Sequence, residues 1–596
     1  RYADWLTKKL EEGKKVWVSG IVNEFHGQFQ LIHPEIEVLE DSTETNDFWH
    51  SRSVLPLYSL TDKINMNLMR KIIYNAFEKY HQYIKETLPE YILQQYQFEP
   101  RNISLQKIHF SANPQEVPKH KMRFAFEELF YTQLMLARTK TNHHKKQNGI
   151  LFTLHKTYTT KLHKSLPFSM TNAQKKVIRE IVEDMTNNSQ MNRLLQGDVG
   201  SGKTIVTLFA LLLAVENGHQ AILMAPTELL AEQHYISIKN MLKNQPELKI
   251  GLLKGGNYKG KKLLKEQIAE GEIDIIIGTH ALIQKDVNFK KIGLVAIDEQ
   301  HRFGVEQRSI LAANHHPDLL YLSATPIPRS LAMTVYGDLD VSVLDELPPG
   351  RKPIKTVWRS DNKRPEVYAE IRHQVIAGRQ IYIVCPLIEE SEKIDLLAAE
   401  TLYENISNNI FPKYRSAILH GKMKTAEKDE IMNKFKNGEI DILVSTTVIE
   451  VGIDVANATV MIIEHAERFG LSQLHQLRGR VGRGSEKSYC YLIAHQPISA
   501  EGRERLAIMV QTNDGFAIAE KDLEIRGPGD FFGTAQSGMP GFKHANLVRD
   551  QELLRQARTI AFEIINKDFN LELPENVTLK ENYFKNYHWR EKLFEY

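Results

Sequence analysis

The residues of this chain best suited to chemistry form a glycine-rich loop, Gly197-Asp198-Val199-Gly200-Ser201-Gly202-Lys203-Thr204, which fits the spacing G-x-x-x-x-G-K-[ST]. Glycines let such a loop curl so that successive backbone N–H groups point at phosphate oxygens. Lys203 would neutralise the β- and γ-phosphates, and the hydroxyl of Thr204 would bind Mg²⁺. Apolar runs before and after the loop supply the strand and the helix that this motif requires. The loop therefore predicts binding of a nucleoside triphosphate.

Two carboxylates that follow another apolar run would complete the phosphate site. Residues 294–297 are typical of a buried strand, and Asp298 and Glu299 come directly after it. Asp298 would bind Mg²⁺, and Glu299 would polarise the attacking water. Because an acidic pair without a role would rarely follow so apolar a strand, we expect this pair to be catalytic.

Two residues upstream of the loop indicate which base is bound. The amide of Gln174 can pair with the N6 and N7 edge of adenine, and Phe168 can stack on the ring. A glutamine on a helix is unremarkable alone, but beside a phosphate-binding loop it favours ATP over GTP.

The second half of the chain has no such loop but carries an arginine-rich segment, residues 476–483. Arg480 and Arg483 are three residues apart, and the glycines around them allow close approach to a phosphate. We expect both to act as arginine fingers across a cleft between domains. The alternative is a basic turn on the surface. Ser323 and Thr325 follow a further strand-like run and are expected to link the nucleotide state to the second domain.

Composition limits the classes of protein to consider. With 596 residues the chain should hold several domains, and its net charge of +2 means that any nucleic-acid surface must be local. Both cysteines, Cys385 and Cys490, lie in apolar runs and are expected to be core residues. No apolar run reaches the roughly 18 residues of a membrane span, and no signal peptide is recognisable, so we expect a cytoplasmic protein. The chain begins at Arg1, and we expect it to lack its natural N-terminus.

The first 60 residues read as short alternating strands joined by glycine and proline turns, which predicts a small β-barrel. Phe25 and Phe29 would flank the tip of one hairpin. They are either barrel core or exposed rings that stack on bases, as in oligonucleotide-binding barrels. Residues 61–150 are predicted to be a helical connector.

Two α/β units follow, at 151–346 and 347–498. Each alternates short apolar runs with amphipathic segments, which indicates a parallel sheet covered by helices on both faces. The predicted strands are centred on 194–195, 221–224, 273–277, 294–297 and 319–322 in the first unit, and on 381–384, 416–419, 440–444, 459–463 and 489–493 in the second. A fifth part, 499–596, is glycine-rich between 515 and 541 and then helical.

In their order, these motifs resemble those of superfamily 2 helicases over residues 165–485. The resemblance implies two tandem RecA-like lobes that close on ATP and step along nucleic acid. Further residues that it implicates are Gly452 and Asp454 at the nucleotide, His301 and Gln476 in coupling, and Thr227, Thr279 and Thr446 at the DNA backbone.

Two features resemble the RecG family within this superfamily. Residues 522–538 are similar to the translocation motif shared by RecG and the transcription-repair coupling factor, and the N-terminal barrel is similar to the OB-fold wedge domain of RecG. The match assigns coupling roles to Arg505, Arg526 and Gln536. It implies an ATP- and Mg²⁺-dependent translocase on double-stranded DNA that remodels stalled forks and Holliday junctions in recombination and repair. It also implies a monomer, with single-stranded DNA-binding protein as a partner.

Three other functions are compatible with parts of the pattern. A motor that displaces RNA polymerase would share the translocation motif but would lack a wedge at this position. An ATP-gated DNA-binding scaffold would have lost residues such as Lys203, Glu299 or Arg480, and all are present. An RNA helicase is disfavoured by Gln300 and by the 522–538 loop.

Overall fold

The computed structural model describes residues 12–13, 16–25, 28–38, 56–60, 64, 66–111, 113–146, 149–256, 258–284, 286–299, 316–323, 328, 339–348, 351–386, 392–446, 455–484, 486–526 and 542–593. The chain divides into two compact units, residues 1–124 and 125–596, which are described separately. None of the helices in these described ranges combines the length and the apolar character that a bilayer crossing requires.

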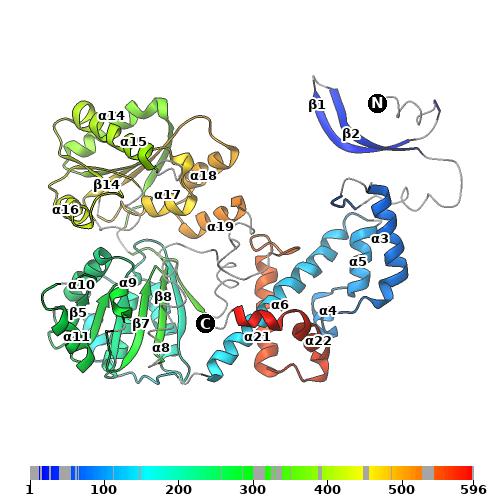
Figure 1. Cartoon of the computed structure of the whole chain (residues 1–596), viewed down its shortest axis with the longest axis horizontal. Helices are drawn as coiled ribbons and strands as arrows, with labels where there is room; N and C mark the ends of the chain where they lie inside the picture. The colour runs from blue at the N-terminus through cyan, green and yellow to red at the C-terminus, as the bar shows by residue number, and fades with distance from the viewer. Residues whose placement is uncertain are drawn as a thin grey trace. The chain divides into compact units, whose positions relative to one another are not determined.

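The first unit contains the predicted hairpin. Strands β1 (Val16–Phe25) and β2 (Gln28–Val38) pair antiparallel, with Phe25 opposite Gln28. Phe29 is 80% exposed, which favours a surface role over a place in a barrel core. The side chain of Phe25 lies outside the described residues. Of the predicted barrel, the described residues of this unit show these two strands (Figure 1).

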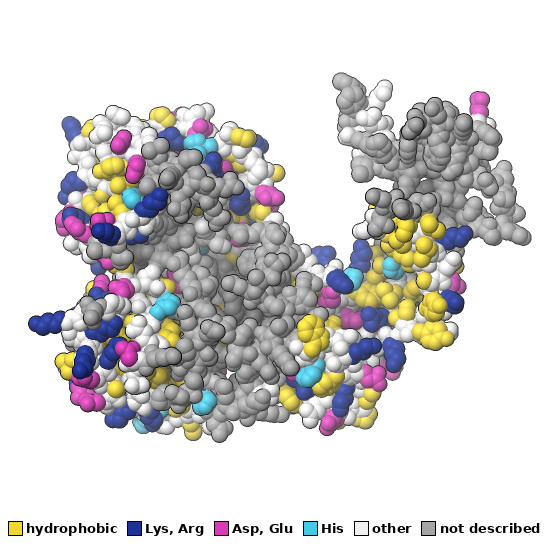
Figure 2. Space-filling model, viewed as in Figure 1, with side chains coloured by type: hydrophobic (Ala, Val, Ile, Leu, Met, Phe, Trp, Pro, Cys, Tyr) yellow, Lys and Arg dark blue, Asp and Glu magenta, His cyan; other side chains and the backbone are white. Residues whose placement is uncertain are grey.

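The predicted helical connector is present. Its elements are α3 (Met66–Tyr80), η1 (His81–Tyr83), α4 (Glu90–Tyr96), α5 (Arg101–Phe110) and the long helix α6 (Val117–Lys146). On α6 the apolar side chains of Phe126, Phe130 and Leu134 are fully buried. On α3, by contrast, Ile72 is 48% exposed, and exposed hydrophobic side chains gather over the helices of the first unit (Figure 2).

A seven-stranded parallel sheet forms the first lobe of the second unit, in the order β5-β6-β4-β7-β8-β3-β9. Five strands match predicted runs, whereas β5 and β9 were not predicted. The strands are β3 (Asn192–Gly197), β4 (Gln220–Met224), β5 (Ile250–Leu253), β6 (Ile275–Gly278), β7 (Ile292–Asp298), β8 (Asp318–Ser323) and β9 (Asp340–Leu344). The helices are α7 (Tyr158–Ser165), α8 (Asn172–Met185), α9 (Lys203–Glu216), α10 (Glu228–Met241), α11 (Lys261–Glu270) and η2 (His280–Ile283). Helix α9 is buried from Ile205 to Val215, so it lies inside the core of the lobe.

A six-stranded parallel sheet forms the second lobe, in the order β10-β15-β14-β11-β13-β12. Here β10 was not predicted. The strands are β10 (Lys355–Ser360), β11 (Gln380–Val384), β12 (Ser416–Leu419), β13 (Ile442–Ser445), β14 (Ala458–Ile463) and β15 (Tyr489–Ala494). The helices are η4 (Asp361–Lys363), α14 (Arg364–Ile376), α15 (Glu392–Asn405), η5 (Ile406–Ile410), α16 (Thr425–Lys436), η7 (Ala466–Arg468) and α17 (Leu471–Arg478). Cys385 and Cys490 are buried free thiols in this lobe, as predicted.

Helices follow the second lobe: α18 (Ala500–Gln511), α19 (Gly515–Arg526), α21 (Gln551–Lys567), η8 (Pro574–Asn576), α22 (Val577–Asn586) and η9 (His588–Leu593). The last of them dock on α6. The ring of Tyr587 stacks on Tyr131 at 4.6 Å, and the guanidinium of Arg138 pairs with Glu591 at 3.0 Å. The carboxylate of Glu128 accepts backbone N–H bonds of 2.8–3.1 Å from residues 543–545. The end of the chain thus holds one face of α6.

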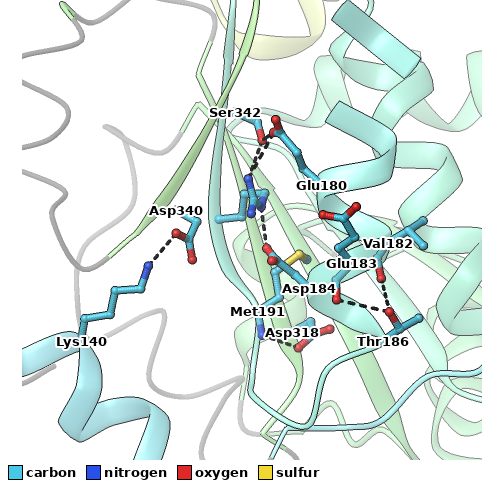
Figure 3. Close-up of polar contacts among 11 residues, drawn as sticks. Lys140, Glu180, Val182, Glu183, Asp184, Thr186, Met191, Asp318, Asp340 and Ser342 are labelled. Atoms are coloured by element: carbon cyan, nitrogen blue, oxygen red, sulfur yellow. Dashed lines mark hydrogen bonds and ion pairs between the residues drawn. The ribbon is translucent and has the colours of Figure 1, made fainter. Parts of the chain in front are cut away.

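A polar network lies near the starts of β3 and β8, at the end of the first sheet away from the phosphate loop (Figure 3). Arg193, on β3, donates to Asp184 at 2.6 Å and to the hydroxyl of Ser342 at 2.7 Å. Asp318, at the start of β8, is fully buried. One of its oxygens accepts the N–H of Met191 at 2.7 Å, and the other has no hydrogen-bond partner among the described residues. Burial therefore raises the pKa of the Asp318 carboxyl to about 8.

Asp318→Asn is expected to stabilise the protein increasingly as the pH rises. The folded carboxyl keeps its proton to about pH 8, whereas the unfolded one ionises near its ordinary value of 3.8. The stability contributed by the protonated group is therefore complete below that lower value and is lost as the pH rises to about 8. Thermal unfolding midpoints at pH 5, 6.5 and 8 test this.

The matched control is Asp286→Asn, because Asp286 is exposed and its ion pair with Lys265 lowers the pKa of its carboxyl. The unfolding midpoint of Asp286→Asn relative to wild type should not rise with pH. An Asp318→Asn midpoint that differs from wild type by the same amount at every pH would contradict the neutral buried carboxyl.

Candidate nucleotide-binding site

The phosphate loop joins the end of β3 at Gly197 to the start of α9 at Lys203. Gly200 and Gly202 have φ of +77° and +90°, which L side chains rarely adopt. A Cβ at Gly200 would collide with the guanidinium of Arg351, and one at Gly202 with the amide of Gln174. The loop is thus a close-fitting cradle of backbone at a helix N-terminus, as the sequence predicts.

The ammonium group of Lys203 lies inside this cradle. Its Nζ donates to the carbonyls of Gly197 at 2.6 Å and Asp198 at 2.9 Å. Burial lowers the pKa of Lys203 to about 8, although Asp298 and other nearby carboxylates favour its charged form. An anion that reached Nζ would restore the charge that burial disfavours.

The acidic pair lies where the sequence places it. Asp298 ends β7, and its Oδ2 is 2.9 Å from Nε2 of His234 on α10. Burial disfavours ionisation of Asp298, but the hydrogen bond and charge of His234, the charge of Lys203 and the Glu299 N–H together outweigh it, so the pKa of this carboxyl is lowered. Glu299 is buried and has φ of +50°, a costly conformation of the kind found at functional sites.

The loop, the acidic pair and the arginines of the second lobe line one cavity of about 530 Å³. Arg480 and Arg483 reach it from the segment after α17. Burial and, to a smaller extent, the nearby charge of Arg351 lower the pKa of Arg483 to about 10. Such crowding of buried cations would be relieved by a polyanion. The predicted residues that line the cavity are Val199, Gly200, Gly202, Lys203, Thr204, Asp298, Glu299, Gln476, Arg480 and Arg483.

The remaining predicted nucleotide contacts lie beside the cavity or outside the described residues. The Oε1 of Gln174 caps α8 by accepting the Thr171 N–H, and its Nε2 donates to the Ser201 carbonyl at 2.9 Å. Gln174 therefore holds the phosphate loop in this structure, and adenine recognition by it stays a prediction. Phe168 is 47% exposed. Gly452 and Asp454 lie outside the described residues.

The predicted coupling residues are only partly described. Arg505, on α18, donates to the carbonyls of Phe469 at 3.1 Å and Glu467 at 3.3 Å, which ties this helix to the segment before α17. Ser323 is buried at the end of β8. The residues outside the described set are His301, Thr325 and Gln536, together with the side chain of Arg526.

The predicted DNA contacts stay predictions. Thr227 is the N-cap of α10, and its hydroxyl accepts the Leu230 N–H at 3.3 Å. Thr279 and Thr446 are buried, with 7% and 1% of their surface exposed.

Sequence reasoning missed several residues of the site. Arg351, near the start of the second lobe, donates to the Val199 carbonyl. His234 and Lys436 line the cavity. His475 directly precedes the arginine-rich segment 476–483, and its Nε2 is 2.6 Å from Oδ1 of Asp198. Only its position next to Gln476 could have signalled this role.

Comparisons with known proteins agree with this geometry. The DEAD/DEAH box helicase family matches residues 171–334, and the helicase conserved C-terminal domain matches 363–485. The RecG wedge domain matches 2–79, and the C-terminal part of RecG domain 3 matches 512–590. A Synechocystis protein named ATP-dependent DNA helicase RecG is 46% identical over 95% of this chain and 68% of its own length. The chain belongs to the RecG family of ATP-dependent DNA helicases.

Other RecG proteins align over a similar extent. The RecG of Bacillus subtilis is 44% identical over 98% of this chain and 84% of its own length. A solved structure of RecG bound to a three-way DNA junction is 42% identical and has a TM-score of 0.69, covering 93% of this chain and 72% of that one. The wedge, two RecA-like lobes and C-terminal domain of the RecG family are therefore the architecture of this chain.

Proposed function

We propose that this chain uses ATP hydrolysis to pull double-stranded DNA and thereby remodels branched DNA, including stalled forks and Holliday junctions. The observation that carries the proposal is that Lys203 and Asp298 of one lobe and Arg480 and Arg483 of the other line the same cavity. Hydrolysis in a site built from two lobes requires their relative movement. A relative of known structure was solved on a three-way DNA junction, which supports a branched substrate.

The chemistry of the proposed site follows from its side chains. Lys203 and the loop N–H groups would hold the β- and γ-phosphates, and Thr204 and Asp298 would hold Mg²⁺. When bound, Mg²⁺ stabilises the charge that develops on the phosphoryl oxygens. Glu299 would orient the attacking water, and Arg480 and Arg483 would stabilise the transition state.

The N-terminal hairpin supplies the proposed wedge. The exposed ring of Phe29 can stack on bases that lose their partners at a branch point, and each such contact contributes about 1–3 kcal/mol. Arg526 and Gln536 would pass lobe movement to the duplex. We assign the wedge to 1–60, the connector to 61–150, the lobes to 151–346 and 347–498, and the translocation part to 499–596.

Further partners are also proposed. We expect a cytoplasmic monomer that works with single-stranded DNA-binding protein. A motor that displaces RNA polymerase is not favoured, because the RecG wedge domain matches the N-terminal residues. A catalytically inactive scaffold is not favoured, because the phosphate-binding and acidic groups are all in place.

The test compares three DNA substrates with one protein preparation. A synthetic fork, a Holliday junction and a linear duplex are incubated with ATP and Mg²⁺, and products are resolved on native gels. We expect ATP-dependent conversion of the fork and the junction, and hydrolysis without strand separation on the linear duplex. Equal strand separation on all three substrates, or none on the branched ones, would contradict the proposal.

A further inference from the structure

A line of buried hydrogen bonds leads from the phosphate loop into the helices that follow the second lobe. It begins at Asp198, whose Oδ1 accepts the Val199 N–H at 2.6 Å and lies 2.6 Å from Nε2 of His475. It continues from Nδ1 of His475 to Nη2 of Arg478 at 3.0 Å. It ends where Nη1 of Arg478 donates to the carbonyls of Met509 at 2.9 Å and Thr512 at 2.8 Å.

The direction of each hydrogen bond is fixed by chemistry. A guanidinium can only donate, so Nδ1 of His475 must accept from Arg478 and carry no proton. The imidazole proton is then on Nε2, which donates to the Asp198 carboxylate. Burial opposes the charge on Asp198, but the hydrogen bond and charge of His475, the Val199 N–H and the charge of Lys203 together outweigh it, so the pKa of this carboxyl is lowered. The two side chains of α17 thus act as one polarised connection.

The connection is well shielded from water. His475 and Arg478 are 4% and 2% exposed, and they lie three residues apart on one face of α17. Buried and satisfied polar networks specify one arrangement of their partners, because each lost bond would leave an unpaired group in a medium of low dielectric constant. The positions of the phosphate loop and of α17 are therefore tied to each other.

At its far end the line reaches the turn between α18 and α19. Met509 lies in the last turn of α18, and Thr512 is the C-cap of that helix. Arg478 therefore satisfies carbonyls that the helix end leaves without intrahelical partners. Ser472 and Asp522 are 3.3 Å apart and fasten α19 to the same helix α17, and these three helices lie together in Figure 1.

The near end of the line lies in the loop that would hold phosphate. In this structure the carbonyl of Asp198 holds Nζ of Lys203, and its carboxylate holds His475. A bound phosphate would draw Nζ away from this carbonyl, because a charged acceptor binds an ammonium more strongly than a neutral one. Asp198 would then be freed to shift, and His475 would shift with it.

We propose that His475 is a positioning residue that reports the occupancy of the phosphate loop to the turn between α18 and α19. The inference rests on the proposed function, since it takes the loop to bind ATP. It adds a direct route from Asp198 to the translocation helices that does not pass through the catalytic arginines.

The test measures hydrogen–deuterium exchange in the full chain with and without a non-hydrolysable ATP analogue and Mg²⁺. In the wild type, exchange should change at residues 197–204 and also at 508–515. In His475→Ala the first change should remain, and the second should shrink about tenfold, a common size for coupling between sites. His475→Gln should keep both changes, because its amide also offers an N–H donor for Asp198 and a carbonyl acceptor for Arg478.

The same variants are compared for base pairs separated per ATP hydrolysed on a fork. We expect about a tenfold loss in His475→Ala and less than a twofold loss in His475→Gln. His219→Gln, a buried histidine before β4, is the matched control and should resemble the wild type. A response at 508–515 that survives His475→Ala would overturn the inference, as would failure of His475→Gln to restore it. No change at 197–204 in the wild type would overturn the ATP site itself, and the inference with it.

Discussion

Lys203→Ala is expected to lower DNA-dependent ATP hydrolysis by about a thousandfold, the upper range for loss of one preorganised charge stabiliser. The Nζ of Lys203 is buried between the loop carbonyls and three carboxylates, those of Asp298, Asp198 and Glu299. Without it, no ammonium would stand between the γ-phosphate and the carboxylates of Asp298 and Glu299. Both nucleotide affinity and turnover should therefore fall.

Steady-state phosphate release with saturating duplex DNA measures this loss. Lys254→Ala is the matched control, because Lys254 pairs with Glu232 near the surface of the same lobe. A thermal unfolding midpoint close to that of the wild type would show that the variant is folded. Full DNA-stimulated hydrolysis in Lys203→Ala would mean that this loop does not bind the triphosphate.

Arg480→Ala should reduce turnover by about 10³- to 10⁵-fold while nucleotide affinity changes only a few-fold, since arginine fingers act mainly on the transition state. Arg480 reaches the cavity from the second lobe, opposite Lys203 and Glu299. It can therefore contact the phosphates only when the lobes lie together. Arg483→Ala should behave in the same way.

Binding of a fluorescent ATP analogue, measured beside single-turnover hydrolysis, separates these two effects. The control is Arg468→Ala, an arginine of the same lobe with 47% of its side chain exposed. An equal loss of affinity and turnover in Arg480→Ala would assign this arginine to ground-state binding, against the prediction.

The sequence predicted the motifs that have a fixed residue spacing and the strands that are fully buried. The phosphate loop and the acidic pair are local motifs, and the central strands are continuous apolar runs. The three strands that were missed lie at edges of their sheets: β5 and β9 in the first lobe and β10 in the second. Edge strands are covered less completely, so they need no continuous apolar run, and β9 alternates polar and apolar residues.

The contacts between distant residues could not be predicted. His475 and Asp198 are 277 residues apart, and His234 and Asp298 are 64 apart. The sequence around either histidine does not indicate its partner, because only the fold brings the two residues together. The same holds for Arg351, because only the fold brings the start of the second lobe against Gly200 of the phosphate loop.

The docking of the chain's end on α6 has a consequence for synthesis. Arg138 donates to the carbonyl of Phe569 at 2.5 Å across 431 residues. While the ribosome makes the two lobes, the face of α6 around Tyr131 has no partner from α22, since that helix has not been made. Contacts of such high sequence separation form late and slowly. A nascent chain of this family should therefore present that face to chaperones until translation is nearly complete, whereas each lobe can fold as it emerges.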